Sequence, residues 1–392
     1  MLRIAVIFES SPFDRKGLFN AVHNRILNLA ASGECIVDAF CIHSWDTAFT
    51  RKVRKTPSVK EKCETLSVDG ITYRMLWYDF SIADHILLEK LHARPFFFGR
   101  FMCENLSLLE GYDCIVAHSF TGGLFAYEAS LRYSVPYFMN WHGSDIHTHP
   151  WRNNLIMKHT RILIENARCN FFVSKALLRE SDRILVTDRK KVLYNGVSDR
   201  FVRFSDEERR ALRKKYGLGS NDKVVAFAGS LVDVKNVHLL QPIFHEVRSR
   251  YDGALKFWVI GDGKRRNVVE PLLLGDTSID VRMFGNLPSD EMPSVMNCID
   301  VLVLPSRNEG LGMVCAEAVR CGANAVGSDV GGVAEVVGRS NVVPLGETLP
   351  EDMAVKVVGM LTTEVCQDVP DYIDWKHTAV QEIACLKENI LL

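Results

Sequence analysis

The sequence predicts an α/β fold with two doubly wound, Rossmann-like domains. Short apolar runs rich in β-branched residues alternate along the chain with helix-like segments, and most of these runs end in Gly, Ser or His. Continuous apolar runs of this kind are typical of parallel strands that are covered on both faces. The chain has 392 residues, 47% of them hydrophobic, which is enough for two separate cores.

The expected strands fall into two groups, one in each half of the chain. They are residues 3–8, 36–42, 114–118, 137–141 and 170–173, followed by residues 224–229, 256–261, 281–284, 301–305 and 323–327. Between the groups, residues 194–222 begin with an Asn-Gly turn, become highly charged and end in Gly, Ser and Asn, which predicts a linker and the helix that enters a second domain. We therefore expect a first domain at residues 1–200 and a second at residues 201–374. Ligands of such folds bind at the carboxyl ends of the strands.

Charge and cysteine content exclude some classes of protein. The formal net charge is -1 and the pI is about 6.9, so no overall positive field is present to hold nucleic acid. The 11 cysteines are scattered and form no CxxC, which favours a reduced, cytoplasmic protein and argues against a zinc site. The first residues resemble a buried strand and not a signal peptide, and no apolar stretch reaches the roughly 20 residues of a membrane-spanning helix.

Two segments of the first domain allow two interpretations. Residues 51–62 are strongly basic, and residues 92–102 place three consecutive Phe between arginines. They are read most simply as a solvated loop and a core segment. The alternative is a peripheral contact at the inner face of an anionic membrane, with the bases on lipid headgroups and the aromatic rings in the interface.

A pair of carboxylates brackets a glycine turn near the C-terminal end. Residues 300–306 predict a buried strand, and Glu309, Gly310 and Gly312 lie in the turn that leads to a helix carrying Glu317. A strand–turn–helix corner directs free backbone N–H groups at an anion such as a diphosphate. The carboxylates themselves are suited to neutral hydroxyls, one for each sugar of a nucleotide sugar. The alternative is a capping residue and a surface Glu.

Other strand ends add weaker signals of the same kind. Lys235 follows a strand and a glycine turn and precedes an apolar helix, where it can pair with phosphate or serve as a solvated charge at the helix start. Glycine turns also follow strands at residues 259–264 and 326–335. Each is uninformative alone, but together they line several strand ends with backbone that can approach a ligand closely.

Taken in order, these motifs resemble the retaining glycosyltransferases with the GT-B fold, of the group-one or family-four type. The resemblance covers nearly the whole chain and is most specific in the last third. It rests on AHS at 117–119, WHGSD at 141–145, VSK at 173–175, YNGV at 194–197, AGSL at 228–231, IGDG at 260–263, PSRNEGLGM at 305–313 and GSDVGG at 327–332.

The resemblance implies an acceptor-binding first domain and a donor-binding second domain that face a central cleft. A C-terminal helix at about residues 375–392 would cross back to the first domain. In the second domain, Glu309 would lie by the donor-sugar hydroxyls and Glu317 by the ribose. The backbone amides of Gly310, Leu311 and Gly312 would hold the diphosphate, which Lys235 would neutralise.

In the first domain the resemblance places His142 near the transferred sugar, with Asp145 close by. The alternative for His142 is a buried histidine bonded to backbone. Gly17 would lie on the acceptor side of the donor phosphate, although residues 10–17 carry a single Gly where the family often has a pair.

In the second domain, Ser230 stands where the family often has Arg. This leaves Ser230 as a donor-binding candidate and Lys235 as the main cation.

The implied reaction moves a sugar from a nucleotide sugar to an acceptor hydroxyl with retention at the anomeric carbon. His142, Lys235 and Glu309 are the expected catalytic residues, and a UDP-sugar is expected before GDP-mannose as donor. We expect no metal and no cofactor besides the nucleotide-sugar co-substrate, because Lys235 and the helix start can hold the diphosphate. The expected acceptor is a saccharide or lipid-linked saccharide of cell-surface polysaccharide or glycolipid assembly.

Two other classes remain open. One is an enzyme of the same fold that does not transfer, such as a nucleotide-sugar epimerase or a phosphorylase dependent on pyridoxal phosphate. The other is a catalytically silent, nucleotide-binding partner subunit.

Overall fold

The computed structural model describes residues 1–11, 13, 17–54, 61–89, 91, 96–363 and 366–390. The chain divides into two compact units, Met1–Asn195 with Trp375–Leu392, and Gly196–Asp374. The two crossings between the units lie together, because Val197 donates its backbone N–H to the carbonyl of Ile373 at 3.4 Å. The assignment of acceptor and donor binding to the two units stays a prediction.

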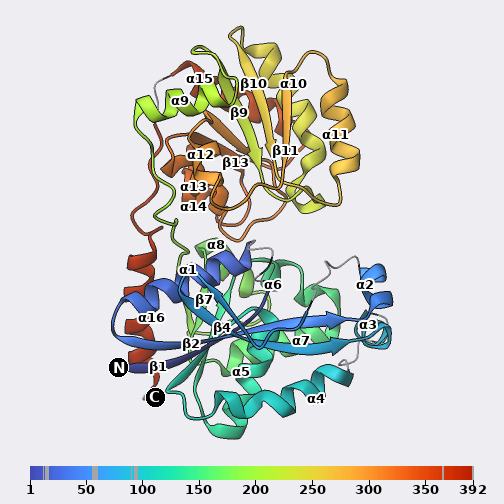
Figure 1. The fold of residues 1–392 in the computed structure, drawn as a ribbon, viewed down its shortest axis with the longest axis vertical. Helices are drawn as coiled ribbons and strands as arrows, with labels where there is room; N and C mark the ends of the chain where they lie inside the picture. Colours follow the sequence, from blue (N-terminus) through green and yellow to red (C-terminus); the bar gives the residue numbers. More distant parts are fainter. Residues whose placement is uncertain are drawn as a thin grey trace. The chain divides into compact units, whose positions relative to one another are not determined.

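The first unit is built on an 8-stranded sheet with the order β3-β4-β2-β1-β5-β6-β7-β8 (Figure 1). Neighbouring strands pair in parallel except β3 and β4, which form an antiparallel hairpin. The strands are β1 Leu2–Glu9, β2 Cys35–Asp46, β3 Thr65–Val68, β4 Ile71–Phe80, β5 Cys114–His118, β6 Tyr137–Trp141, β7 Asn170–Phe172 and β8 Lys190–Val192.

The helices of the first unit connect these strands, and the C-terminal helix joins them. They are α1 Leu18–Ala31, α2 Ala48–Arg54, α3 Ile82–Glu89, α4 Phe96–Asn105, α5 Ser119–Tyr133, α6 Ser144–His147, α7 Asn154–Asn166, α8 Lys175–Ser181 and α16 Trp375–Ile390, with short 3-10 turns at Leu106–Leu109 and Pro150–Arg152. The helix α16 contacts α1, so the last segment of the chain belongs to the first unit.

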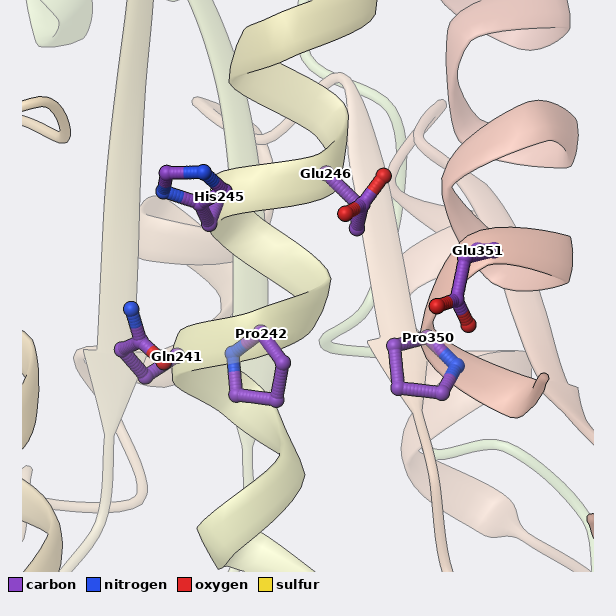
Figure 2. A pocket seen from close by; sticks show the side chains of 6 residues that line it. All are labelled: Gln241, Pro242, His245, Glu246, Pro350 and Glu351. Carbon is purple, nitrogen blue, oxygen red and sulfur yellow. The ribbon is translucent and has the colours of Figure 1, made fainter. Parts of the chain in front are cut away.

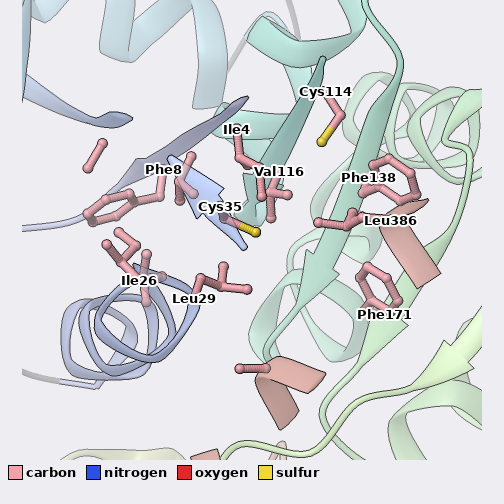
Figure 3. Close-up of a cluster of buried hydrophobic side chains, with 14 of the residues drawn as sticks. Ile4, Phe8, Ile26, Leu29, Cys35, Cys114, Val116, Phe138, Phe171 and Leu386 are labelled. Atoms are coloured by element: carbon pink, nitrogen blue, oxygen red, sulfur yellow. The ribbon is translucent and has the colours of Figure 1, made fainter. Parts of the chain in front are cut away.

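The core of the first unit follows from the alternation of side chains along β1. Ile4 and Phe8 point to the same face as the α1 residues Ile26 and Leu29 (Figure 3). Leu386 of α16 completes this core where it lies beside Phe138 and Phe171 (Figure 3). Each such side chain contributes about 1.5–3 kcal/mol by leaving water. The helix α5 packs on the opposite face, where a Cβ added to Gly122 would lie 2.5 Å from the carbonyl oxygen of Ile7.

The second unit contains a 6-stranded sheet with the order β11-β10-β9-β12-β13-β14, paired in parallel throughout (Figure 1). Its strands are β9 Lys223–Ala228, β10 Leu255–Ile260, β11 Val281–Gly285, β12 Val301–Leu304, β13 Asn324–Ser328 and β14 Val342–Val343. Its helices are α9 Asp206–Lys215, α10 Leu240–Arg250, α11 Arg266–Gly275, α12 Met292–Met296, α13 Met313–Arg320, α14 Val333–Val337 and α15 Leu349–Thr362, with 3-10 turns at Asp233–Lys235, Val237–Leu239 and Arg339–Asn341.

The helix α9 lies within the charged stretch that the sequence analysis assigned to the entry of the second domain. Ser205 accepts the N–H of Glu208 and the Glu208 carboxylate accepts the N–H of Ser205, which completes a capping box. Acidic residues fill its first turn and basic residues its last, so these charges interact favourably with the helix dipole. The cap and these charges stabilise a helix that buries none of its residues.

The β3–β4 hairpin was not predicted, although its turn left a signal. Asp69 and Gly70 have φ angles of 47° and 83°, which suits the two-residue turn that Asp-Gly favours. The edge strands β8 and β14 were also missed because they are short.

The segments considered for membrane contact are only partly described. Residues 55–60 and 92–95 lie outside the described residues, and residues 51–54 belong to α2. The side chains of Phe96 and Phe97 are likewise outside the described set. Phe98 is 7% exposed and packs edge-on against Tyr78 with ring centroids 5.3 Å apart, so its membrane interpretation is wrong.

Candidate active site

The strand order of the second unit defines where a ligand can bind. The order reverses between β9 and β12, so the connections that leave these adjacent strands run to opposite sides of the sheet. A crevice forms outside the carboxyl ends of two such strands. The loop after β9 carries Ser230 and Lys235, and the loop after β12 carries Ser306, Glu309 and the glycine turn.

Lys235 and Glu309 meet at this reversal point although 74 residues separate them in sequence. The Lys235 Nζ donates to Glu309 Oε1 at 2.5 Å, and Ser306 Oγ donates to the same oxygen at 2.7 Å. The lysine side chain is 23% exposed and the glutamate side chain 11%, so the pair is partly withdrawn from water. One cation and one carboxylate are therefore held side by side in the loops that follow β9 and β12.

The loop after β12 lies against the glycine turn after β13. A Cβ on Gly331 would come within 1.8 Å of the carbonyl oxygen of Glu309, and Gly332 donates its N–H to the carbonyl of Gly310 at 3.2 Å. The chain then enters α13 through Gly312, whose φ of 84° favours glycine. Leu311 between them is 3% exposed and anchors the turn.

The first turn of α13 offers backbone donors. Its N-cap is Gly312, no side chain in the described part of the chain caps it, and its first turn contains no acidic residue. The first N–H groups of a helix have no partner within it and carry a partial positive charge. The turn that ends in Gly312 therefore leads directly into a helix start and follows Glu309, the partner of Lys235.

The loop after β9 is braced in the same way. A Cβ on Gly261 would lie 2.0 Å from the carbonyl oxygen of Gly229, so the turn after β10 packs directly on the turn that carries Ser230. Arg307 donates its backbone N–H to the carbonyl of Val234 at 2.8 Å, which joins the loops after β9 and β12. Ser230 itself is exposed. Together these contacts fix Lys235 relative to Glu309.

Glu317 lies on α13 and is half-buried, like Glu309. Burial raises its pKa to about 7, and the charge of Arg200 offsets part of this shift. Among the described residues, no hydrogen bond joins Glu317 to Lys235 or Glu309. Its carboxyl group is therefore close to half ionised at neutral pH and is not already committed to the cation of the site.

The first unit has its own reversal point, between β1 and β5. Gly17 begins α1 after β1, His118 ends β5, and His142 follows the next strand, β6. Gly17 has φ of 45° and ψ of -106°, and a Cβ there would meet no atom of the described residues within 4 Å. Its open surroundings fit a ligand-facing position, while residues 14–16 before it lie outside the described residues.

Asp145 holds the backbone that carries His142. Its Oδ1 accepts the N–H of Gly143 at 2.8 Å, and both carboxylate oxygens accept the N–H of His142 at 3.0 Å. Burial raises the pKa of Asp145 to about 6, and these backbone donors oppose the shift. The carboxylate thus positions the loop, and a direct contact of Asp145 with the donor stays a prediction.

His142 is bonded to a second histidine that the sequence analysis did not assign. His142 Nε2 and His118 Nδ1 are 2.9 Å apart, and the rings are stacked with centroids 5.2 Å apart. Burial, and then the charge of Arg25, lowers the pKa of His142 to about 3, and burial lowers the pKa of His118 as well. Both rings are therefore neutral at physiological pH.

A buried ion pair behind this loop was also missed. Arg25 of α1 is 1% exposed and lies 3.4 Å from the carboxylate of Glu382 on α16. The same guanidinium donates to the side-chain oxygens of Asn140, on β6, and Asn195. Nothing in the sequence near Arg25 distinguishes it from a surface helix arginine, because its partners lie 115 or more residues away.

A separate surface pocket has no part in this site. It has a volume of about 210 Å³ between α10 and α15, where Pro242 and Glu246 lie on the side of Pro350 and Glu351 (Figure 2). None of the predicted site residues lines it. Within the described ranges, no group of three or more His, Cys, Asp or Glu residues is arranged to hold a metal ion, and no helix is long and apolar enough to cross a membrane.

Each unit matches a glycosyltransferase family model. Residues 37–196 match the glycosyl transferase 4-like domain, and residues 208–349 match the glycosyl transferases group 1. An uncharacterized glycosyltransferase of Methanocaldococcus jannaschii is 27% identical over 67% of this chain and 69% of its own length. The teichuronic acid biosynthesis glycosyltransferase TuaC of Bacillus subtilis is 25% identical over 58% of this chain and 56% of its own length.

Solved structures share the fold over the whole chain. Anabaena HepE in complex with UDP and glucose covers 98% of this chain, with 97% of its own length aligned, a TM-score of 0.67 and 15% identity. Sucrose-phosphate synthase from Thermosynechococcus elongatus covers 99% of this chain and 99% of its own length, with a TM-score of 0.70 and 15% identity.

The protein therefore has the GT-B fold, as the sequence predicted. The chain belongs to the group 1, 4-like family of glycosyltransferases, which are retaining enzymes that use nucleotide sugars.

Proposed function

We propose that this protein transfers a sugar from a nucleotide sugar to an acceptor hydroxyl, with retention at the anomeric carbon and without a metal ion. The observation that carries the proposal is the Lys235–Glu309 contact at 2.5 Å beside the glycine turn that starts α13. A cation, a helix start and a carboxylate are brought together at one reversal point. This set matches a ligand that combines a diphosphate with a hydroxyl-rich sugar.

In the proposed complex, the diphosphate takes the place of Glu309 as the partner of Lys235. The amides of Gly310, Leu311 and Gly312 and the start of α13 add backbone donors to the phosphate oxygens. Glu309, released from the lysine, accepts hydrogen bonds from the donor-sugar hydroxyls. As the glycosidic bond to the diphosphate breaks, negative charge grows on the leaving oxygens, and the fixed Lys235 and helix start stabilise it.

The remaining candidates fill supporting roles in this proposal. Glu317, whose pKa is about 7, binds the ribose hydroxyls in its ionised form. Ser230 is exposed on the loop that also carries Lys235, and it offers a hydroxyl to the donor phosphate. His142 contacts the transferred sugar, Asp145 fixes its loop, and Gly17 leaves room for the acceptor side of the phosphate.

The donor is proposed to be a UDP-sugar, ahead of GDP-mannose. Support comes from solved relatives of the same fold, including Anabaena HepE with UDP-glucose and the E. coli trehalose-6-phosphate protein with UDP-2-fluoro glucose. We propose a saccharide or lipid-linked saccharide acceptor of cell-surface polysaccharide or glycolipid assembly, supported by the likeness to TuaC.

We also propose a cytoplasmic location with contact at an anionic membrane. The support is α2, where Phe49 and Val53 are 64% and 47% exposed and Lys52 lies between them. An apolar edge flanked by bases suits a lipid interface. Flotation of the wild type with anionic liposomes, and its loss in Phe49→Ser, tests this contact, and a wild type that stays in the unbound fraction rejects it.

The transfer reaction is tested by incubating the purified chain with UDP-glucose, UDP-galactose, UDP-N-acetylglucosamine and GDP-mannose over a panel of sugar acceptors, with and without EDTA. Nucleotide release that requires an acceptor, persists in EDTA and yields an α-linked product is expected. Isomerised donor without acceptor would instead indicate an epimerase. Nucleotide binding with no turnover on any acceptor would indicate a silent partner subunit.

A further inference from the structure

Two cysteines that are far apart in sequence meet in the first unit. Cys169 directly precedes β7, and Cys385 lies on α16. Both are free thiols, 3% exposed, in the core where Leu386 lies beside Phe171 (Figure 3). The Cys169 thiol is hydrogen-bonded to the Cys385 sulfur. The two sulfur atoms are therefore in direct contact between the sheet and the last helix of the chain.

The sheet places a lysine beside this pair. In the parallel pairing of β7 with β8, Phe171 lies opposite Lys191. Because side chains two positions apart on a strand point to the same face, Cys169 and Phe171 face α16, and Lys191 shares that face. The Lys191 ammonium is hydrogen-bonded to Cys385 and lies 3.5 Å from the Glu388 carboxylate. The Cys385 sulfur thus has a thiol and a cation as neighbours.

A second surface hollow reaches the Cys385 side chain. It has a volume of about 420 Å³ and lies between the edge of the sheet and α16. Lys191 and Leu193 form part of one wall, and Gln381, Cys385 and Glu388 form part of the other. Because Cys385 lines the hollow and yet is only 3% exposed, its position favours a small reagent over a bulky one.

The neighbours of Cys385 favour its thiolate. The hydrogen bond from Cys169 and the charge of Lys191 lower the pKa of Cys385 to about 7, against burial and the charge of Glu388. The same hydrogen bond, together with burial, raises the pKa of Cys169, so this thiol stays protonated. Burial also raises the pKa of Cys315, which is the usual result for a core thiol. Since the thiolate is the nucleophilic form, Cys385 is the reactive member of the pair.

We propose that Cys385 and Cys169 form a peroxide-reactive pair, in which a small hydroperoxide oxidises Cys385 and Cys169 then closes a disulfide with it. The Cys385 thiolate attacks one peroxide oxygen, the O–O bond breaks, and the leaving oxygen takes up a proton and departs as water or an alcohol. The Cys169 sulfur then attacks the Cys385 sulfenic acid. The S–S bond forms, the S–O bond breaks, and the hydroxyl group leaves with the Cys169 proton as water.

The disulfide is a reversible link between the sheet and α16. With hydrogen peroxide as the oxidant, two thiols and one peroxide give one disulfide and two water molecules. In a reducing compartment such bonds are transient, and exchange with a dithiol returns both cysteines to thiols. The inference concerns the first unit alone and does not depend on the proposed transfer function.

The test is mass spectrometry of the full chain after treatment with hydrogen peroxide at neutral pH and alkylation of the remaining thiols. The expected product is lighter by two hydrogen atoms before alkylation, contains linked Cys169 and Cys385 peptides, and is restored by dithiothreitol. Cys103 and Cys366 are exposed and serve as internal controls that should remain reduced when the pair has reacted. Oxidation of these two ahead of Cys385, or oxidised protein without the linked peptides, would overturn the proposal.

The variant Cys169→Ser tests which cysteine closes the disulfide. Without the second thiol, the sulfenic acid of Cys385 persists, so dimedone is expected to label Cys385 strongly in the variant and weakly in the wild type. Equal labelling of Cys385 in both proteins would show that Cys169 has no part in the reaction. The wild-type experiment stands by itself if the variant does not fold.

The effect of charge is tested by two variants at the hollow. Lys191→Met removes the cation and is expected to slow the oxidation of Cys385 at pH 6 about 10-fold, because each unit of pKa changes the thiolate fraction tenfold there. Glu388→Gln removes the carboxylate that pairs with Lys191, so it should react at least as fast as the wild type. An unchanged rate in Lys191→Met, or equal slowing in both variants, would contradict the activation of Cys385 by Lys191.

Discussion

The buried pair between Arg25 and Glu382 predicts that one substitution on α16 destabilises the whole first unit. Both side chains are at most 1% exposed, and the guanidinium and carboxylate lie 3.4 Å apart. Burial lowers the pKa of Arg25 and raises that of Glu382, with each charge partly restoring the other. Removing one partner leaves a buried charge uncompensated.

Glu382→Leu is expected to cost about 3–5 kcal/mol, the usual loss when one partner of a buried pair is removed. For a domain of this size, about 2–4 °C of melting temperature corresponds to each kcal/mol, which gives a decrease of roughly 6–20 °C. Circular dichroism melting of the full chain measures the shift. Hydrogen exchange of α1 and α16 should show that the loss is located in the first unit.

A matched control lies one to two turns further along the same helix. Glu388 is 67% exposed and pairs with Lys191 at 3.5 Å, so Glu388→Gln is expected to cost less than about 1 kcal/mol. The double variant Arg25→Met, Glu382→Leu should be more stable than Glu382→Leu alone, since it removes the unpaired charge. Equal shifts for Glu382→Leu and Glu388→Gln, or strictly additive losses in the double variant, would refute the reasoning.

Three further predictions concern the second unit. Glu309→Ala should lower turnover on the order of 10²-fold, because it removes the carboxylate proposed to bind the donor sugar, and near-normal turnover would exclude Glu309 from the site. The raised pKa of Glu317, about 7, means that its folded form keeps a proton that the unfolded chain releases, so its contribution to stability is lost as pH rises through 7. Binding of ribose by the carboxylate should run the other way: UDP affinity measured by calorimetry should increase about 10-fold from pH 6 to pH 8, and the same increase in Glu317→Gln would contradict this role. Gly331→Ala should displace the loop of Glu309, since its φ is 51° and a Cβ would lie 1.8 Å from the Glu309 carbonyl oxygen; UDP binding should weaken, whereas Gly346→Ala, which has open space around its Cβ, should bind normally.

The sequence predicted the central strands because their signals are local. The expected strands at residues 114–118 and 137–141 coincide with β5 and β6, whose residues are all buried. A continuous apolar run can be recognised in the sequence without knowing which strands will lie beside it in the sheet. The β3–β4 hairpin was not predicted because β3 has only 4 residues and because Arg74 and Asp79 interrupt the apolar run in β4, so that only the Asp-Gly turn marked it.

The same difference between local signals and long-range contacts decides which parts of the candidate site could be predicted. The sequence could place Lys235 and Glu309 each after a strand and beside glycine, because strand ends and turns are local features. It could not show that the two side chains touch, since that depends on β9 and β12 being neighbours. The histidine pair was missed for this reason: His118 and His142 meet only because β5 lies beside β6.

Asp145 has a structural role in its own loop that the sequence analysis did not assign. The resemblance placed it in the site, and the structure shows its carboxylate accepting backbone N–H groups of its own loop. The spacing of three residues between His142 and Asp145 is what permits this closure. Such local side-chain to backbone bonds are common for Asp, and a turn interpretation of the motif would have suggested it.

The most direct test of the account is UDP binding by titration calorimetry with wild type, Lys235→Ala and the control Lys214→Ala, whose lysine is exposed on α9. A charged hydrogen bond to phosphate contributes about 1.5–3 kcal/mol, so Lys235→Ala should bind roughly 10- to 100-fold more weakly while Lys214→Ala binds like the wild type. Equal affinity of Lys235→Ala and wild type for UDP would contradict the claim that the Lys235–Glu309 contact marks the donor diphosphate site.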